Sequence, residues 1–270
     1  MRGGSNISTG DVLRYVFVTI LTLWVLGPIA ISIVYGFAAT DEYYSDKPIP
    51  SRFTLEHIKV LWSLGAGEAI INSIVVGIGT VFLSFLLGLP AGYALARYRF
   101  SGRDIILLGI VATRMFPVIV ISVSLLKTFF GLGLADTLQG IILAHTAMAL
   151  PFVILISSAI FSGVPRELEE AGYIFGMGKA GVFIRITLPL AAPGLAAAAM
   201  FTFLLSWNEV FIASVLSLTN RTLPAFILTS ALATPTDPIK FAASTLMVVP
   251  ALIFILLARR YLITMWAIGR

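Results

Sequence analysis

The 270-residue sequence contains no cysteine and few charged residues. Without cysteine the chain has no disulfide, no thiolate metal ligand and no cysteine nucleophile. Only 11% of the residues are charged and 59% are hydrophobic, whereas about one quarter of an ordinary soluble domain is charged. Such a chain has too little polar surface to face water on every side, which excludes a soluble globular domain and makes the lipid bilayer its solvent.

Long apolar runs occupy most of the chain, and each is near the ~20 residues that a membrane-spanning helix needs. Backbone amides in hydrocarbon must bond internally, and the runs lack the alternating pattern of a membrane β-barrel, so we predict helices. The runs are Tyr15–Thr40, Ala69–Ala96, Ile105–Leu126 (interrupted by Arg114), Thr137–Pro165, Ile186–Asn208 and Phe241–Ala258. The sequence therefore predicts an all-α membrane protein with six transmembrane helices.

The first run could also be a cleaved signal peptide, because Arg2 and Arg14 precede it and the small residues Gly36 and Ala38 lie near its end. Its uncharged length exceeds the roughly 7 to 15 apolar residues of such signals. We therefore predict a retained first helix.

Each predicted span carries a proline, which removes a backbone donor and can kink the helix. Kinked helices suit a bundle that rocks between two states, but proline is also common in membrane helices without that role. In the second span, Gly88 and Gly92 form a pair of small residues that permits close helix packing.

Basic residues indicate the orientation. Eleven of them flank one set of span ends: Arg2, Arg14, Arg97, Arg99, Arg103, Arg166, Lys179, Arg185, Arg259, Arg260 and Arg270. Six lie in the opposite loops: Lys47, Arg52, Lys59, Lys127, Arg221 and Lys240. The positive-inside rule then predicts a multi-pass protein with both termini in the cytoplasm. Because the basic residues lie beside span ends and form no stripe on a soluble face, the net charge of +5 does not indicate nucleic acid.

We predict two parts: residues 1–68, with the first helix and an external loop, and a membrane domain of residues 69–270. The external stretch from Asp41 to Glu68 is polar and contains Pro48 and Pro50, which is typical of a small lid or partner surface.

The connection between the fourth and fifth spans, residues 162–188, is longer than most connections between packed helices. Its sequence predicts a helix within this loop. Pro165 suits the first turn of a helix, and Val164, Leu168, Ala171 and Phe175 recur at helical spacing to give one apolar face. Gly176 supplies a stop. An amphipathic helix in a cytoplasmic loop needs a cover, either the membrane surface or a protein groove.

In this loop Glu170 and Ala171 are followed by Gly176, then by nine residues, and then by Ile186, Leu188 and Pro189. This spacing resembles the EAA loop of bacterial ABC importer permeases. Further matches are typical of the carbohydrate branch: Phe53–Glu56, Asn72–Ser73, Tyr93–Arg97 with Phe100 and Gly102, Met115–Pro117 and Trp207–Glu209. The sequence departs from the family at Gly172, where alanine is usual, and at Phe175, where aspartate is usual, so its fit to the ATPase is expected to differ.

The resemblance implies the type I ABC importer fold, in a binding-protein-dependent uptake system of the bacterial inner (plasma) membrane. The loop would form a cytoplasmic coupling helix seated in a groove of the ATPase, through Glu169, Glu170, Ala171, Phe175, Gly176, Ile186, Leu188 and Pro189. The expected partners are a second homologous permease, two ATPase subunits, an extracytoplasmic solute-binding protein, a sugar-like substrate and membrane lipid.

This chain is expected to bind no cofactor and to be no enzyme, with ATP and magnesium on the partner ATPase. The loop does contain Gly178 followed by Lys179, as in a phosphate-binding P-loop. That motif needs four residues between its glycines and a Ser or Thr after the lysine, whereas five separate Gly172 from Gly178 and Ala180 follows.

Two ionisable residues lie within predicted spans, where such residues are usually functional. Arg114 lies in the third span, and Glu209 follows Trp207 and Asn208 in the fifth. These four residues are candidates for the translocation pathway of a sugar, and Arg114 leaves an acidic sugar derivative open. The alternatives are an Arg114–Glu209 ion pair that fixes helix packing, or snorkelling to an interface.

His145 is an isolated imidazole, for which packing or a helix–helix hydrogen bond is a simpler interpretation than a proton relay. Two other functions remain as alternatives. An ion-coupled secondary transporter of a small polar solute would need inverted repeats, and none is visible. An intramembrane enzyme would need a nucleophile, metal cluster or acid–base pair, and the sequence indicates none.

Overall fold

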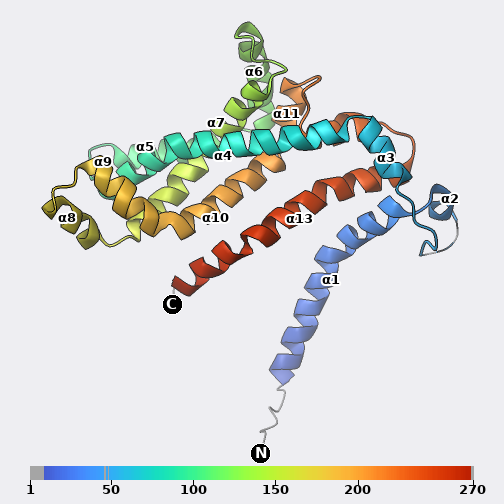
Figure 1. Ribbon diagram of the computed structural model, residues 1–270, viewed down its shortest axis with the longest axis horizontal. Coiled ribbons are helices and arrows are strands. Elements are labelled where there is room, and N and C mark those ends of the chain that lie inside the picture. The colour runs from blue at the N-terminus through green and yellow to red at the C-terminus, as the bar shows by residue number, and fades with distance from the viewer. Residues whose placement is uncertain (1–8, 46, 48, 269–270) are drawn as a thin grey trace, which may run out of the picture. The chain divides into compact units, whose positions relative to one another are not determined.

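The computed structural model describes residues 9–45, 47 and 49–268 (Figure 1). Within these residues the secondary structure is helical, apart from an isolated antiparallel bridge between Ala38 and Phe53. The prediction of an all-α chain is therefore confirmed. The chain divides into two compact units, Met1–Leu64 with Ser230–Val249, and Gly65–Thr229 with Pro250–Arg270. Arg2 and Arg270, used above for orientation, lie outside the described residues.

Most of the predicted spans correspond to long apolar helices. Four described segments are long and apolar enough to cross a membrane: Gly10–Phe37, Ala66–Arg97, Leu138–Ser162 and Lys179–Trp207. The sixth predicted run, Phe241–Ala258, lies inside the 32-residue helix α13 (Asp237–Ile268).

The third predicted span differs from the expectation of one continuous helix. It consists of α5 (Arg103–Ala112), the 3₁₀ turn η1 (Thr113–Met115) and α6 (Val118–Gly131), with a 91° bend between the two halves. Phe116 and Pro117 are both extended at this break, because the proline ring disfavours helical geometry in the residue before it and lacks a backbone N–H. The other prolines within described helices, Pro28, Pro90, Pro151, Pro193 and Pro250, do not interrupt them.

The larger unit is built on helices α4, α7 and α10, which pack side by side (Figure 1). Its elements before the bend are α4 (Ala66–Arg97) and α5, and those after α6 are α7 (Leu138–Ser162), α8 (Arg166–Ile174), α9 (Lys179–Val182), the π-helical segment η2 (Phe183–Thr187), α10 (Leu188–Trp207), α11 (Phe211–Leu216) and α12 (Leu223–Phe226). A second π-helical segment, η3 (Ile227–Ala231), spans the boundary between the units.

Glycines allow α4 to approach α7 closely. A Cβ on Gly88 would lie 2.7 Å from Cγ1 of Val153, and one on Gly92 would lie 2.9 Å from the carbonyl oxygen of Ile154. Both distances are too short for a real side chain, so only glycine fits. The predicted role of this pair in helix packing is confirmed.

Two buried clusters fill this unit. One consists of Val76, Phe129, Ile141, Ala144, Ile212, Ala213, Leu216 and Ala225. The other consists of Tyr93, Phe161, Val164, Ala191 and Leu195, and it lies where α4 and α7 end and α10 begins. The second cluster is the base on which the loop between α7 and α10 rests.

The smaller unit contains α1 (Thr9–Phe37), α2 (Thr40–Tyr43), α3 (Glu56–Ser63) and residues 230–249. Glu42 organises its loop, because its carboxylate accepts hydrogen bonds from the backbone N–H (3.0 Å) and the hydroxyl (2.9 Å) of Ser51. The Ser51 backbone N–H, followed by its hydroxyl, lowers the pKa of Glu42 below its ordinary value. The described residues around Glu42 and Ser51 therefore form an ordered element and not a loose linker, whereas Pro48 lies outside the described residues.

Candidate functional site

The loop between α7 and α10 contains the predicted amphipathic helix. Helix α8 begins at Arg166, directly after Pro165, and ends at Ile174. Gly176 has a φ of +82°, a left-handed conformation that L side chains rarely adopt. Proline and glycine thus set the two ends of α8, as the sequence predicts.

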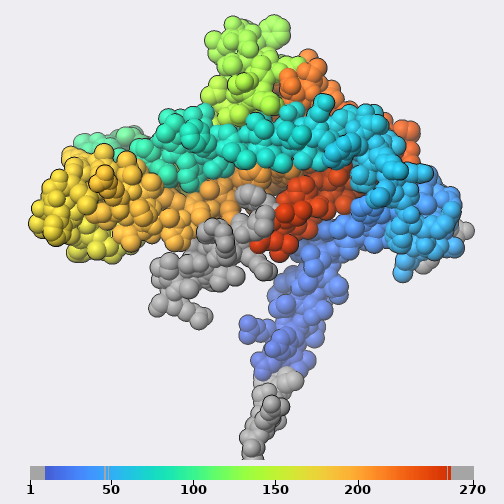
Figure 2. Space-filling view, in the orientation of Figure 1, coloured from blue at the N-terminus to red at the C-terminus, as the bar shows by residue number. Residues whose placement is uncertain are grey.

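The outer face of α8 carries large exposed apolar side chains. Ile174 is 83% exposed and Phe175 84% exposed at the end of the helix, and Leu168 in its first turn is 44% exposed. Glu170 is also exposed and Ala171 is partly buried. Figure 2 shows the α8 and α9 segment at an open end of the larger unit. The structure therefore presents an apolar surface where a coupling surface was predicted.

The predicted apolar stripe is wrong in one member. Val164 precedes the helix and is buried in the cluster around Phe161, because the extended backbone at Pro165 takes it off the helical face. Ile174 lies on the exposed face and was missed, because the four-three-four spacing that was used skipped it.

Glu169 does not share the exposed face of Glu170. It is 5% exposed, and both of its carboxylate oxygens are bonded inside the protein. Arg97 Nε and Nη2 each lie 2.8 Å from Oε1, the Thr187 hydroxyl donates to Oε1 at 2.7 Å, and the Tyr93 hydroxyl donates to Oε2 at 3.0 Å. Glu169 therefore connects α8 to α4 and to η2 and does not share the exposed apolar face of α8.

The second half of the loop folds back against α8. A Cβ on Gly172 would lie 2.6 Å from Cδ1 of Ile186, so the alanine usual at this position would not fit without a shift. Leu188 packs against the cluster around Phe161, and Pro189 is exposed in the first turn of α10. Of the predicted coupling residues here, Ile186 and Leu188 are thus internal supports and Pro189 is at the surface.

Arg114 lies beside the break in the third span. Its Nη1 donates to the carbonyl oxygen of Met148 at 2.8 Å, and its guanidinium carbon lies 3.7 Å from the centre of the Phe152 ring. It borders a cavity of about 150 Å³ whose lining also includes Thr113, Phe116, Val118, Ile121, Ala144, Ala147, Met148, Pro151 and Ile212. Arg114 is exposed at this cavity.

Glu209 is buried, and its partner is His145. Its Oε2 lies 3.3 Å from Nε2 of the imidazole, and Nδ1 of the same ring bonds the Ser206 hydroxyl at 2.8 Å. The Glu209 carboxylate also accepts the backbone N–H groups of Ile212 and Ala213, each at 3.0 Å, and so caps α11. The alternative of an Arg114–Glu209 ion pair is wrong, because Arg114 bonds the Met148 carbonyl and the Glu209 carboxylate lies against His145.

Trp207 and Asn208 end α10 in different environments. Trp207 is 1% exposed and stacks on Phe203, with ring centroids 5.9 Å apart. Asn208 is exposed, and its side-chain amide donates to the carbonyl of Leu204 at 2.9 Å. Of the four pathway candidates, Arg114 and Asn208 are exposed, whereas Trp207 and Glu209 are buried within this chain.

The sequence reasoning missed an anchor at the opposite end of the unit, Asp136. Its Oδ1 accepts the backbone N–H groups of Leu218 (2.8 Å), Thr219 (2.9 Å) and Asn220 (3.1 Å), and its Oδ2 accepts the Thr219 hydroxyl at 2.6 Å. Partial desolvation alone raises the pKa of Asp136, but these donors outweigh it and lower the pKa to about 2. A signal was available, since an aspartate soon after Gly131 and Gly133 is a frequent loop anchor.

The same end of the unit is also tied to α4. The Asn72 side-chain amide donates to the carbonyl of Arg221 at 3.1 Å, and the Ser73 hydroxyl accepts the backbone N–H of Leu223 at 2.7 Å. Helix α4 thus holds the 217–223 loop near its first residues and the α8 loop near its last, at Tyr93 and Arg97.

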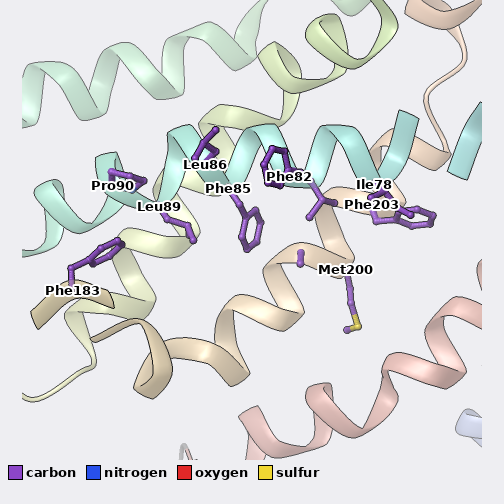
Figure 3. A pocket seen from close by; sticks show the side chains of 11 residues that line it. Ile78, Phe82, Phe85, Leu86, Leu89, Pro90, Phe183, Met200 and Phe203 are labelled. Carbon is purple, nitrogen blue, oxygen red and sulfur yellow. The ribbon is translucent and has the colours of Figure 1, made fainter. Parts of the chain in front are cut away.

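An apolar groove runs between α4, η2 and α10 (Figure 3). Its volume is about 610 Å³, and its lining consists of Ile78, Val81, Phe82, Phe85, Leu86, Leu89, Pro90, Phe183, Ala199, Met200 and Phe203. These side chains offer almost no hydrogen-bonding atoms, so the groove does not suit a polar solute.

Comparison with known proteins places these features in a context. Residues 84–264 match the family described as "Binding-protein-dependent transport system inner membrane component". The chain is 30% identical over 261 residues to the trehalose transport system permease protein SugB of Mycobacterium tuberculosis, covering 93% of this chain and 95% of that one. It is 32% identical over 264 residues to the diacetylchitobiose uptake system permease protein DasC of Streptomyces coelicolor, covering 93% of this chain and 94% of that one.

The fold also matches a solved structure. A chain of a bacterial ABC transporter that imports the acidic polysaccharide alginate superposes with a TM-score of 0.80, covering 97% of this chain and 99% of that one at 18% identity. The predicted importer fold is thereby confirmed, and at this identity the likeness concerns the fold alone.

Proposed function

Because the chain belongs to the family of binding-protein-dependent transport system inner membrane components, we propose that it is a permease subunit that forms the translocation pathway of an ATP-driven sugar importer. The observation that carries the proposal is the anchored helix α8, which exposes Leu168, Ile174 and Phe175 while its opposite side is bonded to α4. Such a surface is built to receive force from a docked protein.

A sugar or sugar derivative is the substrate class that the relatives favour. Those compared above are named for trehalose and diacetylchitobiose, and they match this chain over nearly their whole lengths. Family membership does not favour the alternative of an ion-coupled secondary transporter, because the family is one of binding-protein-dependent systems.

The partner at α8 is an ATPase subunit, present in two copies in the assembly, with ATP and magnesium bound on that subunit. A short helix with an exposed apolar face is the usual form of a helix-in-groove contact. Phe175 enlarges this apolar face at a position where the family usually carries aspartate. The matching ATPase groove is therefore expected to be more apolar there. A second homologous permease and an extracytoplasmic solute-binding protein complete the complex.

The orientation follows from the basic residues at the α8 end of the larger unit. Arg97, Arg103 and Arg166 gather there, bonded to carbonyl oxygens at this end of α4 and α8. With this end in the cytoplasm, the loop held by Asp136 faces outward toward the binding protein, in the bacterial inner membrane. Both chain termini are then cytoplasmic.

Arg114 and Asn208 are the residues that we assign to the solute pathway, with Trp207 and Glu209 behind them as support. Uptake of neutral and acidic sugars by an Arg114→Gln variant tests the first assignment. A selective loss of acidic sugars is expected if the guanidinium faces the solute, since it binds anionic groups bidentately. Unchanged selectivity would contradict the assignment.

The proposal as a whole is tested by co-producing the chain with the ATPase and binding protein encoded nearest its gene. The ATPase is expected to co-purify, and uptake of the binding protein's ligand into proteoliposomes is expected to require ATP. An Ile174→Glu variant should lose the ATPase, whereas Lys59→Gln, at an exposed site in the smaller unit, should retain it. Uptake driven by an ion gradient without ATP would contradict the proposal.

A further inference from the structure

We propose that Glu169 is a positioning residue that links helix α8 to α4 and to the start of α10, so that movement of α8 is transmitted to both. The inference rests on the proposed function, in which α8 receives the motion of an ATPase. It concerns the inner side of the helix, where Glu169 is buried within this chain.

The geometry around Glu169 makes it the junction of three elements. Its carboxylate belongs to α8, Arg97 and Tyr93 belong to the last turns of α4, and Thr187 is the last residue of η2, next to α10. Four donor groups of these residues converge on two oxygen atoms within 3.0 Å. No other acidic residue of α8 is buried.

Arg97 strengthens the junction because it binds two parts of the loop at once. Its side chain is 7% exposed, and besides Glu169 its Nη2 donates to the carbonyl oxygen of Val164 at 2.8 Å. One guanidinium thus holds both the residue before Pro165 and the middle of α8. The helix cannot shift relative to α4 without breaking or moving these bonds.

A buried ion pair of this kind is weak evidence for stability, because desolvation offsets much of the attraction between the charges. Its distinctive property is strength at a fixed distance, because charge-assisted hydrogen bonds are shorter and roughly twice as strong as neutral ones. A link that must push and pull α4 during a reversible cycle therefore benefits from the Glu169 carboxylate.

The connection to α10 passes through an unusual segment. Residues Phe183–Thr187 are π-helical, and π-helical turns occur mostly as single turns within α-helices and are frequent at functional sites. Ile186, in the same segment, lies close to Gly172 of α8, where a Cβ would come within 2.6 Å of the Ile186 Cδ1. Helix α8 therefore touches this segment at two points, one apolar and one through the Thr187 hydroxyl.

The test uses the complete transporter in proteoliposomes, with ATP hydrolysis and solute uptake measured on the same preparation. Glu169→Gln keeps the shape of the side chain but removes the charge that holds Arg97. We expect assembly with the ATPase and ATP hydrolysis to persist, while solute taken up per ATP falls at least about fivefold, the lower range of coupling between sites.

Glu170→Gln is the matched control, because this residue is the neighbouring glutamate on the exposed face. A change there should alter ATPase binding, so that hydrolysis and uptake fall together and their ratio stays constant. Charge-preserving Arg97→Lys should recover part of the ratio that Arg97→Gln loses.

If Glu169→Gln does not assemble, the double variant Glu169→Leu with Arg97→Met carries the test, because it leaves no unpaired buried charge. An uptake-to-ATP ratio equal to that of the unaltered protein in either variant would overturn the inference. Failure of the unaltered chain to bind an ATPase would instead overturn the proposed function, so the two failures are distinguishable.

Discussion

Replacing Asp136 by asparagine tests whether one carboxylate orders the 217–223 loop of the larger unit. The substitution keeps one oxygen, which can still accept from the backbone, and replaces the other by an NH₂ group that cannot accept. The Thr219 hydroxyl then loses its 2.6 Å partner. The amides of Leu218, Thr219 and Asn220 exchange an ionised acceptor for a neutral one, which is roughly half as strong.

The size of the effect follows from the pKa of Asp136. Its ordinary value of 3.8 is lowered to about 2 in the folded protein, and each unit corresponds to about 1.4 kcal/mol. Because the carboxylate is partly exposed, solvent screening reduces this contribution, and we expect the substitution to cost about 1–2 kcal/mol of local stability. Since the folded pKa is the lower one, the contribution is complete above the ordinary value and is lost as the pH falls toward the folded value.

Hydrogen exchange detected by mass spectrometry measures this loss at neutral pH. The peptide that contains Leu218, Thr219 and Asn220 should exchange about 5 to 30 times faster in the Asp136→Asn variant, since 1.4 kcal/mol is a factor of ten. Asp104→Asn is the control, because the Asp104 side chain is 93% exposed. Equal exchange of the loop in Asp136→Asn and the unaltered protein would refute the reasoning.

Three further predictions concern the docking face, the helix contact and the buried pair. Phe175→Asp should weaken ATPase co-purification with the native ATPase, and unchanged retention would show that the Phe175 ring lies outside the contact. Gly92→Val should lower the thermal midpoint of the purified protein through overpacking of about 1–3 kcal/mol, whereas the same change at the open position Gly109 should have a far smaller effect. Glu209→Gln should lower stability by about 1–3 kcal/mol, because the His145 contact and part of the α11 cap are lost; a changed KM for solute at an unchanged thermal midpoint would instead assign Glu209 to the pathway.

The arrangement of α4 relates these sites to one another. Its first turns hold the 217–223 loop through Asn72 and Ser73, and its last turns hold α8 through Tyr93 and Arg97. In the proposed function, one rigid helix therefore connects the ATPase side with the binding-protein side. The close packing against α7 at Gly88 and Gly92 keeps this helix from moving alone.

Hydropathy located the membrane helices from the sequence because a bilayer imposes one requirement on every span. Each spanning helix needs about 20 consecutive, mostly apolar residues, and its backbone groups must form hydrogen bonds within the segment. The same local logic predicted α8, since proline and glycine act on their own backbone at Pro165 and Gly176. The family was also recognisable, because its motif lies within one stretch of the chain.

Tertiary structure alone decided which side of each helix is covered and which charges meet. Periodicity placed Glu169 beside Glu170 but could not tell that one is buried and the other exposed, because the covering groups come from α4, more than 70 positions earlier. The sequence left open an ion pair between Arg114 and Glu209, yet in the structure it is His145 that lies against Glu209. An ion pair depends on distances in space that a single sequence does not contain, whereas a hydrophobic run or a turn depends on neighbours that it does.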